Sequence, residues 1–481
     1  MGISFNASSL LNGNGLDVAS VVKAILTPET SNLTALQNQQ TSLTSDAGLL
    51  ASYNNDLNSL ATAVNALNDP SGPLASLIAT SSQPSILTAS ADTTAISGTH
   101  QIVVSSLATT GTVYTDPVAG GPNVSILPTG QNTGDIKLQV GGTLGPIEDI
   151  PITAGSNDTL TTLASYINAQ SATNSWGVTA SVVSDASGSR LAIYSQSSGS
   201  PGALAITNNT TTLNFNTPVG GTNASLTVDG VPLDSPTNSI ASAIPGVTLN
   251  LVSAAVGTPV QITVGPDAAN ATAAITTFVS AYNAVINDLN TQFSVDPTTN
   301  TEGPLGGDTA LRSLQSSVLS DATYSISGNS GLVNLASLGI SSNDDGTLSV
   351  DSTQLSTTFA TNPAAFQNFF QNASGTGFAN NFASDLINLT DPTTGALNLD
   401  IASNTTQQQS LTTQISDLQD NITTQTAALT LQYDQVNATL ESYPSLLQEV
   451  TAELGALSGT TPTTTPTSSN TTPTSGTATG G

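Results

Sequence analysis

The sequence contains no cysteine, one histidine and only four basic residues among its 481. Without cysteine it can form no disulfide bond, no thiolate metal site and no cysteine nucleophile. A single histidine, His100, excludes a histidine metal cluster and leaves a histidine-dependent catalytic triad without supporting neighbours. The chain carries 32 acidic residues, and its formal net charge of −28 would repel nucleic acids and anionic membranes. The basic residues are Lys23, Lys137, Arg190 and Arg312.

Long hydrophobic runs and a high density of charge are also missing. No stretch reaches the roughly 18 uninterrupted apolar residues that a membrane span needs, so we expect no membrane insertion. Residues 1–30 lack the basic start, apolar run and small-residue cleavage site of a secretory signal, so export would require another route. Charged residues make up 7% of the chain and aromatic residues 4%, which predicts an aliphatic core and a surface of hydroxyl, amide and methyl groups.

What the chain does have is a seven-residue repeat of apolar side chains near both ends. Such a repeat keeps one seam of an α-helix facing a partner helix, as a coiled coil requires. The first series is Leu36, Leu43, Leu50, Leu57 and Val64. The second series is Ile415, Ile422, Leu429, Val436, Tyr443, Val450 and Leu457. We therefore predict an α+β multidomain fold, with a coiled-coil-like helical stem from both termini and two β-rich head domains inserted in the middle.

The two ends of this repeat suggest different partners. We predict that the stem helices pack through Leu36, Leu43, Leu50, Leu57, Val64, Ile415, Ile422 and Leu429. Near the C-terminus Leu440, Leu447 and Leu454 add a second apolar stripe, and a helix apolar on two faces needs more than one partner. We therefore predict assembly contacts with other molecules at Leu440, Tyr443, Leu447, Val450, Leu454 and Leu457, and in the N-terminal segment at Leu16, Val18, Val21 and Val22. The alternative is an intramolecular stem that only stabilises the monomer. Pro444 is expected to kink or break the last helix.

Between the two heptad segments the apolar period changes to two. Alternating residues from about 84 to 264 predict strands, and Asp229-Gly230 predicts a tight hairpin turn. Residues 135–195 follow a β-α-β-β pattern of their own, which predicts an inserted subdomain. The predicted organisation is a flexible N-terminal leg of 1–32, a helical stem of 33–83 and 265–435, an inner β-rich head domain of 84–112 and 222–264, an outer β-rich head domain of 113–221, a C-terminal leg helix of 436–459 and a disordered Thr/Pro-rich tail of 460–481.

A few isolated residues invite a chemical function, and each has a simpler explanation. Asp344-Asp345-Gly346 lacks the ligand spacing of a calcium loop and predicts a turn before a strand. His100 opens a predicted strand and is expected to be a strand-edge side chain. Trp176 is the sole tryptophan, and core packing is preferred over stacking on a carbohydrate. We therefore predict no catalytic residue, no metal site and no cofactor.

Several short motifs, in this order, resemble the flagellar filament cap family, hook-associated protein 2 (FliD). They are Gly15-Leu16-Asp17-Val18 with Val21-Val22-Lys23, Val228-Asp229-Gly230-Val231, Gly246-Val247-Thr248-Leu249-Asn250-Leu251, Leu311-Arg312-Ser313-Leu314 and Asp345-Gly346-Thr347-Leu348. The 135–195 unit is similar to a module inserted in many flagellar axial proteins, notably around Gly177-Val178-Thr179-Ala180 and Arg190-Leu191. The likeness covers about residues 10–459.

The resemblance implies a structural protein that caps the distal end of the flagellar filament. Copies would join in a small ring-shaped homo-oligomer that promotes the folding and insertion of exported flagellin and prevents its loss. The implied location is extracellular, at the flagellum tip, after export through the flagellar type III channel. Further implied partners are hook–filament junction proteins, the export apparatus and a secretion chaperone. The alternatives are another flagellar axial protein, such as a hook–filament junction protein, or a surface adhesin whose head binds a host or surface glycan.

Overall fold

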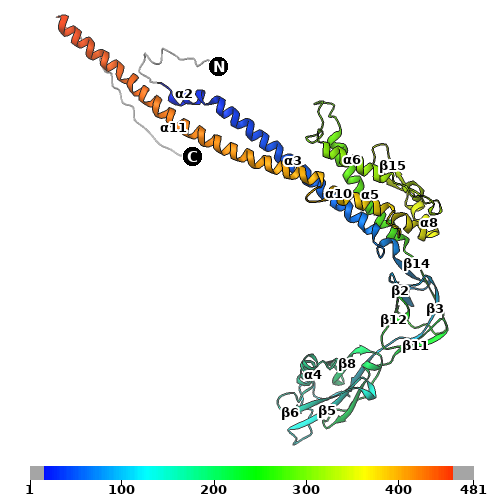
Figure 1. Ribbon diagram of the computed structural model, residues 1–481. Coiled ribbons are helices and arrows are strands. Elements are labelled where there is room, and N and C mark those ends of the chain that lie inside the picture. Colours follow the sequence, from blue (N-terminus) through cyan, green and yellow to red (C-terminus); the bar gives the residue numbers. More distant parts are fainter. Residues whose placement is uncertain (1–15, 459–481) are drawn as a thin grey trace. The chain divides into compact units, whose positions relative to one another are not determined.

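The computed structural model describes residues 16–458 (Figure 1). The chain divides into two compact units. The first unit consists of 1–54 and 391–481, and the second of 55–390. The structure mixes helices with several small antiparallel sheets, as the predicted α+β class requires. The predicted tail of 460–481 and the first part of the predicted leg lie outside the described residues.

In the first unit most of the described residues between 16 and 54 are helical. Helix α2 spans Val18–Ile25, and helix α3 spans Thr27–Asn68. The Asp17 side chain caps α2 by accepting a hydrogen bond from the Ser20 N–H at 3.1 Å. Pro28 does not delay α3, because the first turn of a helix needs no N–H donor at that position. Only Leu26 lies between the two helices, and α3 begins before residue 33.

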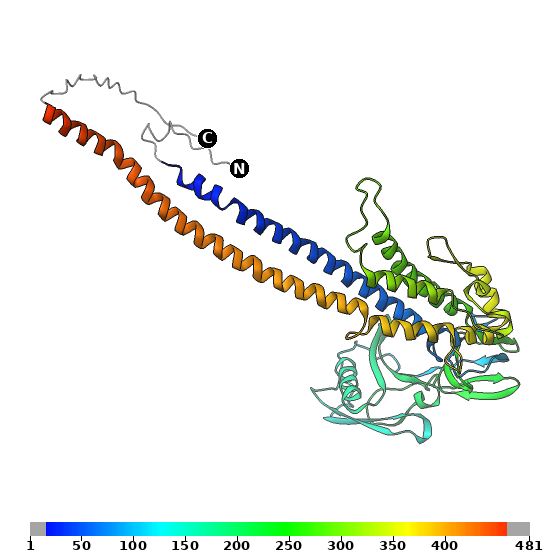
Figure 2. The same cartoon turned by 45° about the horizontal axis from the view of Figure 1, so that its top comes forward.

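Helix α11, Ala396–Ser458, runs antiparallel to α2 and to the first part of α3 within this unit. The Gln408 Nε2 atom donates to the Leu43 carbonyl at 3.1 Å, and the Leu16 N–H donates to Asn437 Oδ1 at 2.5 Å. Later residues of α2 and α3 thus contact earlier residues of α11, as in an antiparallel pair. Figures 1 and 2 show the blue and orange helices side by side. Pro444 lies inside α11 and does not end it.

The helical part of the second unit has an aromatic core, although aromatic residues are scarce in the chain. Its elements are the end of α3, α5 (Ala268–Phe293), α6 (Thr309–Ala322), α7 (Leu335–Leu338), β15 (Ile340–Ser342), β16 (Leu348–Val350), α8 (Ser352–Thr361), α9 (Pro363–Phe370) and α10 (Phe378–Thr390). The buried phenylalanines are Phe278, Phe359, Phe366, Phe369, Phe370, Phe378 and Phe382. The Phe359 and Phe366 rings meet edge to face at 5.1 Å, an arrangement that aromatic quadrupoles favour.

An inner sheet domain continues from this helical part. A five-stranded antiparallel sheet has the order β1-β14-β3-β10-β11, and a three-stranded sheet has the order β12-β13-β2. The strands are β1 (Leu77–Ser81), β2 (Leu87–Ala91), β3 (Gly98–Ser106), β10 (Ala224–Val228), β11 (Val231–Ser235), β12 (Ser239–Ile244), β13 (Val247–Leu251) and β14 (Val260–Pro266). Asp229 and Gly230 join β10 to β11 with φ of 50° and 81°, the geometry that the predicted hairpin turn needs. Inward-facing aliphatic residues such as Ile102 and Leu249 form the core.

An outer sheet domain is inserted between β3 and β10. Two three-stranded antiparallel sheets, β4-β8-β7 and β6-β5-β9, share a core with helix α4. The elements are β4 (Thr110–Tyr114), β5 (Thr133–Val140), β6 (Ile147–Thr153), α4 (Leu160–Asn174), β7 (Val178–Asp185), β8 (Gly188–Ser198) and β9 (Leu204–Asn209). The α4 side chains Leu160, Leu163 and Ile167 are buried against the sheets. None of the helices within 16–458 combines the length and the apolar character that crossing a membrane requires.

Candidate assembly surface

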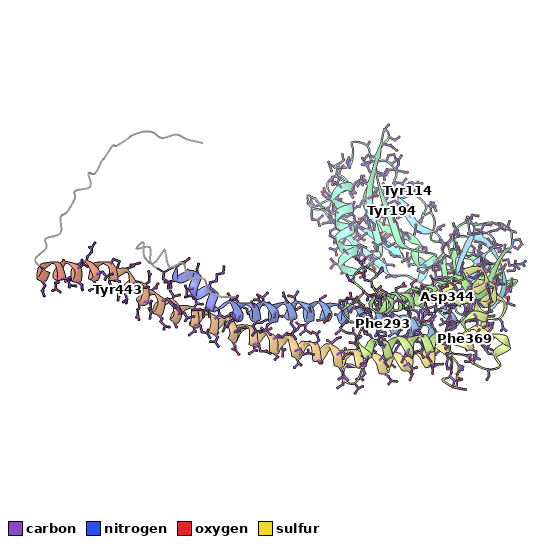
Figure 3. The ribbon with its side chains drawn as sticks, turned by 90° about the horizontal axis from the view of Figure 1, so that it is seen from above. Tyr114, Tyr194, Phe293, Asp344, Phe369 and Tyr443 are labelled. Atoms are coloured by element: carbon purple, nitrogen blue, oxygen red, sulfur yellow. The ribbon has the colours of Figure 1, made fainter. Side chains whose placement is uncertain are left out.

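The distal part of α11 carries a stripe of exposed apolar side chains. Spacings of four and three residues place these side chains along one face of the helix. Leu454 is 64% exposed and Leu457 is 90% exposed, and Figure 3 shows Tyr443 on this part of α11. We call the stripe the distal stripe, and it consists of Tyr443, Leu447, Val450, Leu454 and Leu457, each at least half exposed. Leu446 is also half exposed beside it, and Leu440 is half-buried.

Exposure of this kind leaves a large amount of apolar surface in water. Full burial of one leucine or valine side chain contributes about 1.5–3 kcal/mol. A contiguous patch of exposed apolar surface typically marks a site of interaction with another molecule. The stripe therefore has the chemistry of a face that packs against another helix. Its sequence neighbours include Glu453, next to Leu454, and Pro444, next to Tyr443.

The N-terminal side chains predicted to make assembly contacts are more enclosed. Val21 and Val22 are buried, whereas Leu16 and Val18 are half-buried. Val22 and Ile422 line a cavity of about 330 Å³ between α2 and α11. In the described chain, therefore, Val21 and Val22 already make contacts inside the first unit, and Leu16 contacts α11 at Asn437, before the distal stripe begins.

The predicted stem residues separate into two groups. In the first unit Leu50 and Ile415 are buried, whereas Leu36, Leu43, Ile422 and Leu429 are half-buried. Leu57 and Val64 are fully buried in the second unit, together with Leu60 and Leu67. Sequence reasoning missed Leu60 and Leu67, although they follow Leu57 and Val64 at three-residue spacing. The seam of α3 thus serves two different cores.

Most of the few cations in the described residues are engaged in ion pairs of the second unit. Arg190 pairs with Asp185, and the guanidinium lowers the pKa of that carboxyl. Arg312 pairs with Glu302 at 3.1 Å and lies 4.7 Å above the Phe293 ring. The Lys137 Nζ atom lies 3.5 Å from an Asp149 oxygen and 3.9 Å from an Asp135 oxygen.

The three residues considered for chemistry all have structural roles. His100 lies on β3, and its Nδ1 is 2.8 Å from Asp229 Oδ2 at the β10–β11 turn. Asp345 accepts hydrogen bonds from the N–H and the hydroxyl of Thr347, which builds a turn before β16 and lowers the pKa of the Asp345 carboxyl. Trp176 is 9% exposed in the core of the outer sheet domain, so its ring offers no platform for a sugar.

Sequence models of one family match both ends of the chain. The model described as "Flagellar hook-associated protein 2 N-terminus" matches residues 14–111, and the model described as "Flagellar hook-associated protein 2 C-terminus" matches residues 221–445. Between them, the "Flagellin hook IN motif" matches residues 135–197, within the outer sheet domain. Together the first two models cover more than half of the chain.

Individual relatives agree with these matches. The B-type flagellar hook-associated protein 2 of Pseudomonas aeruginosa is 28% identical over 421 residues, which are 80% of this chain and 86% of the relative. The flagellar hook-associated protein 2 of Escherichia coli strain K12 is 27% identical over 373 residues, or 72% of this chain and 76% of the relative. The D1-D2-D3 domains of the flagellar cap protein FliD from Escherichia coli share the fold, with a TM-score of 0.56 at 23% identity over 74% of this chain and 99% of that one. The chain therefore belongs to the flagellar hook-associated protein 2 family.

Proposed function

We propose that this protein caps the distal end of a bacterial flagellar filament. At the tip it promotes the folding and insertion of exported flagellin subunits and prevents their loss. The observation that carries this proposal is the match of both family models, at the two ends of a chain whose fold is that of a flagellar cap protein. The relatives named above are hook-associated protein 2 proteins, which disfavours the junction-protein and adhesin alternatives.

The cap acts as a small ring-shaped homo-oligomer, and its distal stripes are covered by neighbouring molecules. The exposure of Tyr443, Leu447, Val450, Leu454 and Leu457 supports this role, because a monomer leaves these side chains in water. Leu440, and Leu16 and Val18 of the N-terminal segment, extend the same contact region, and the buried Val21 and Val22 support it from within the first unit. Upstream of it, the antiparallel α3 and α11 act as a coiled-coil-like stem, a role supported by the hydrogen bond from Gln40 Nε2 to Thr412 Oγ1 at 2.9 Å.

Each part of the chain has a separate role in the cap. The helical segments of 33–83 and 265–435 form the stem, the segment of 436–459 forms the leg, and the two sheet domains form a head that faces outward. Partners are other copies of the chain, flagellin and hook–filament junction proteins. The protein reaches the tip through the flagellar export channel with the help of a secretion chaperone, and it is a structural protein rather than an enzyme.

Deletion of the gene tests the capping function directly. A strain without the protein should release monomeric flagellin into the medium and grow no normal filaments, and the wild-type gene should restore them. Normal filaments in the deletion strain would refute the proposal.

A second experiment tests the distal stripe separately. The triple variant Leu447→Ser, Val450→Ser and Leu454→Ser should fail to restore filaments, and the purified protein should scatter light as a monomer. Each serine removes an apolar contact worth about 1.5–3 kcal/mol on full burial. The matched control is Leu144→Ser, because Leu144 is 98% exposed on the outer sheet domain and should tolerate the change. A triple variant that assembles like the wild type would eliminate the stripe as the contact.

A further inference from the structure

Two carboxyl groups face each other between α6 and α10 in the second unit. Asp321 is 4% exposed near the end of α6, and its Oδ1 accepts a hydrogen bond from Asn381 Nδ2 on α10 at 3.3 Å. Its other oxygen, Oδ2, is buried and has no hydrogen-bond partner in the structure. Asp385, one turn beyond Asn381 on α10, lies within side-chain hydrogen-bonding reach of Asp321. Two ionised carboxylates in this arrangement would repel each other.

The surroundings provide no positive charge to neutralise the pair. The other titratable group that acts on Asp321 is Tyr282 on α5, whose hydroxyl donates to the Gly346 carbonyl at 3.1 Å. None of the five ion pairs among the described residues includes Asp321 or Asp385. Asp321 also lies in the last turn of α6, where the unpaired carbonyl groups of a helix end disfavour a negative charge. Neutralising one of the two carboxyl groups therefore removes a repulsion between α6 and α10.

One added proton would let the two carboxyl groups form a hydrogen bond with each other. The protonated Asp321 would donate an O–H to the half-buried Asp385 carboxylate, a charge-assisted hydrogen bond. We propose that Asp321 and Asp385 share one proton, and that this proton stabilises the packing of α6 against α10. The helical part of the second unit is therefore most stable in an acidic medium and becomes less stable as the medium becomes alkaline. The pair takes the place of a salt bridge in a chain with few cations.

The electrostatics agree with this geometry. Burial, and then the Asp385 carboxyl, raise the pKa of Asp321 to about 8 from the ordinary value of 3.8. A folded-state pKa above the unfolded value means that the folded chain binds the proton more tightly. The stabilisation is complete below the unfolded pKa, decreases as the pH rises, and is lost once the pH passes the folded pKa. The sensitive window therefore runs from about pH 4 to about pH 8.

Two other pairs of neighbouring carboxyl groups in the second unit have one member with a raised pKa. Asp56 on α3 has its pKa raised by burial and then by Asp288 on α5. Asp135 on β5 has its pKa raised chiefly by Asp149 on β6, with Lys137 acting in the opposite direction. Each pair joins two different elements, and in the second pair the Lys137 ammonium lies 3.5 Å from an Asp149 oxygen and 3.9 Å from an Asp135 oxygen.

The variant Asp321→Asn tests the inference in the full-length protein. The asparagine keeps the shape and can donate to Asp385 at every pH, so the variant mimics the protonated acid. Urea unfolding followed by far-ultraviolet circular dichroism would be measured from pH 5 to pH 9. Relative to the variant, the unfolding constant of the wild-type helical part should rise about tenfold per pH unit between pH 5 and pH 7. The exposed control Asp344→Asn should follow the wild type.

Two further measurements keep the inference falsifiable if Asp321→Asn does not fold. Asp385→Asn removes the neighbouring charge and should reduce the same pH dependence. Infrared spectroscopy of the wild type at neutral pH should show the carbonyl band of a protonated carboxylic acid, and this band should be lost at pH 9. Equal pH dependence in the wild type and in either foldable variant would overturn the inference, as would the absence of a protonated carboxyl at neutral pH.

Discussion

Replacing Asn168 by alanine should open the free edge of strand β7. This strand ends the sheet β4-β8-β7, and the Asn168 side chain on α4 acts as a substitute for a neighbouring strand. Asn168 Nδ2 donates to the Ala180 carbonyl at 2.8 Å, and its Oδ1 accepts from the Ala180 N–H at 2.7 Å. Ala180 is 4% exposed, so water has little access to these two backbone groups once the amide is removed.

The magnitude follows from the two unpaired groups. Leaving one buried donor or acceptor unpaired costs about 1–3 kcal/mol, so two unpaired groups should destabilise β7 locally by about 2–6 kcal/mol. Expressed as an opening equilibrium, this is roughly a 30- to 20,000-fold loss of hydrogen-exchange protection. The second cap remains, because Ser171 Oγ donates to the Val178 carbonyl at 2.7 Å and accepts from the Val178 N–H at 3.1 Å. The loss should therefore be concentrated around residue 180.

Hydrogen exchange with mass spectrometry on the full chain is the assay. Peptides that cover β7 should exchange faster in Asn168→Ala, and peptides of the helical part of the second unit should be unchanged. The control is Asn174→Ala, because Asn174 is exposed on the same helix and bonds only locally, to Gln170 Oε1 at 2.9 Å. Unchanged protection at β7, or an equal effect of the control, would refute the view that a side chain closes this sheet edge. An opened edge is also expected to promote association, which light scattering would detect.

Two further substitutions test the helical part of the second unit. Phe366→Ala should destabilise it by about 3–5 kcal/mol, because the ring is fully buried against Phe359 and Phe370, and thermal unfolding followed by circular dichroism would measure the loss. Asp308→Ala should cost about 0.5–2 kcal/mol, because the carboxylate accepts from the Ala310 N–H at 2.7 Å and from the Leu311 N–H at 3.1 Å at the start of α6. In the same assay, a change from Asp308 to Asn that cost as much as the alanine would contradict the capping role.

Sequence prediction was most successful for structures that depend on residues close together in the chain. The Asp229-Gly230 hairpin turn and the turn at Asp344-Asp345-Gly346 are both present, because each depends on neighbours along the chain. Strand β6 was missed, because adjacent Glu148 and Asp149 interrupt the alternation and Pro151 is unfavourable in a strand. The predicted break at Pro444 does not occur, and α11 continues through that residue.

Long-range partners were harder to predict than elements. A seven-residue repeat shows that a helix has an apolar seam, but it does not say which element covers that seam. Leu43 and Leu57 stand in one series, yet they belong to different units. The Asp321–Asp385 pair gave no signal at all, because 64 residues separate the partners and neither stands in a recognisable motif. The concentration of phenylalanine in one core was likewise invisible to overall composition.

The position of Trp176 makes the outer sheet domain optically distinct. It is the only tryptophan in the chain, and it is nearly enclosed in that domain's core. Indole emission excited at the red edge of its absorption band therefore originates from one domain alone, while circular dichroism is dominated by helices elsewhere. Comparing the two signals during a single denaturation would reveal whether the head melts independently of the helices, without any added label.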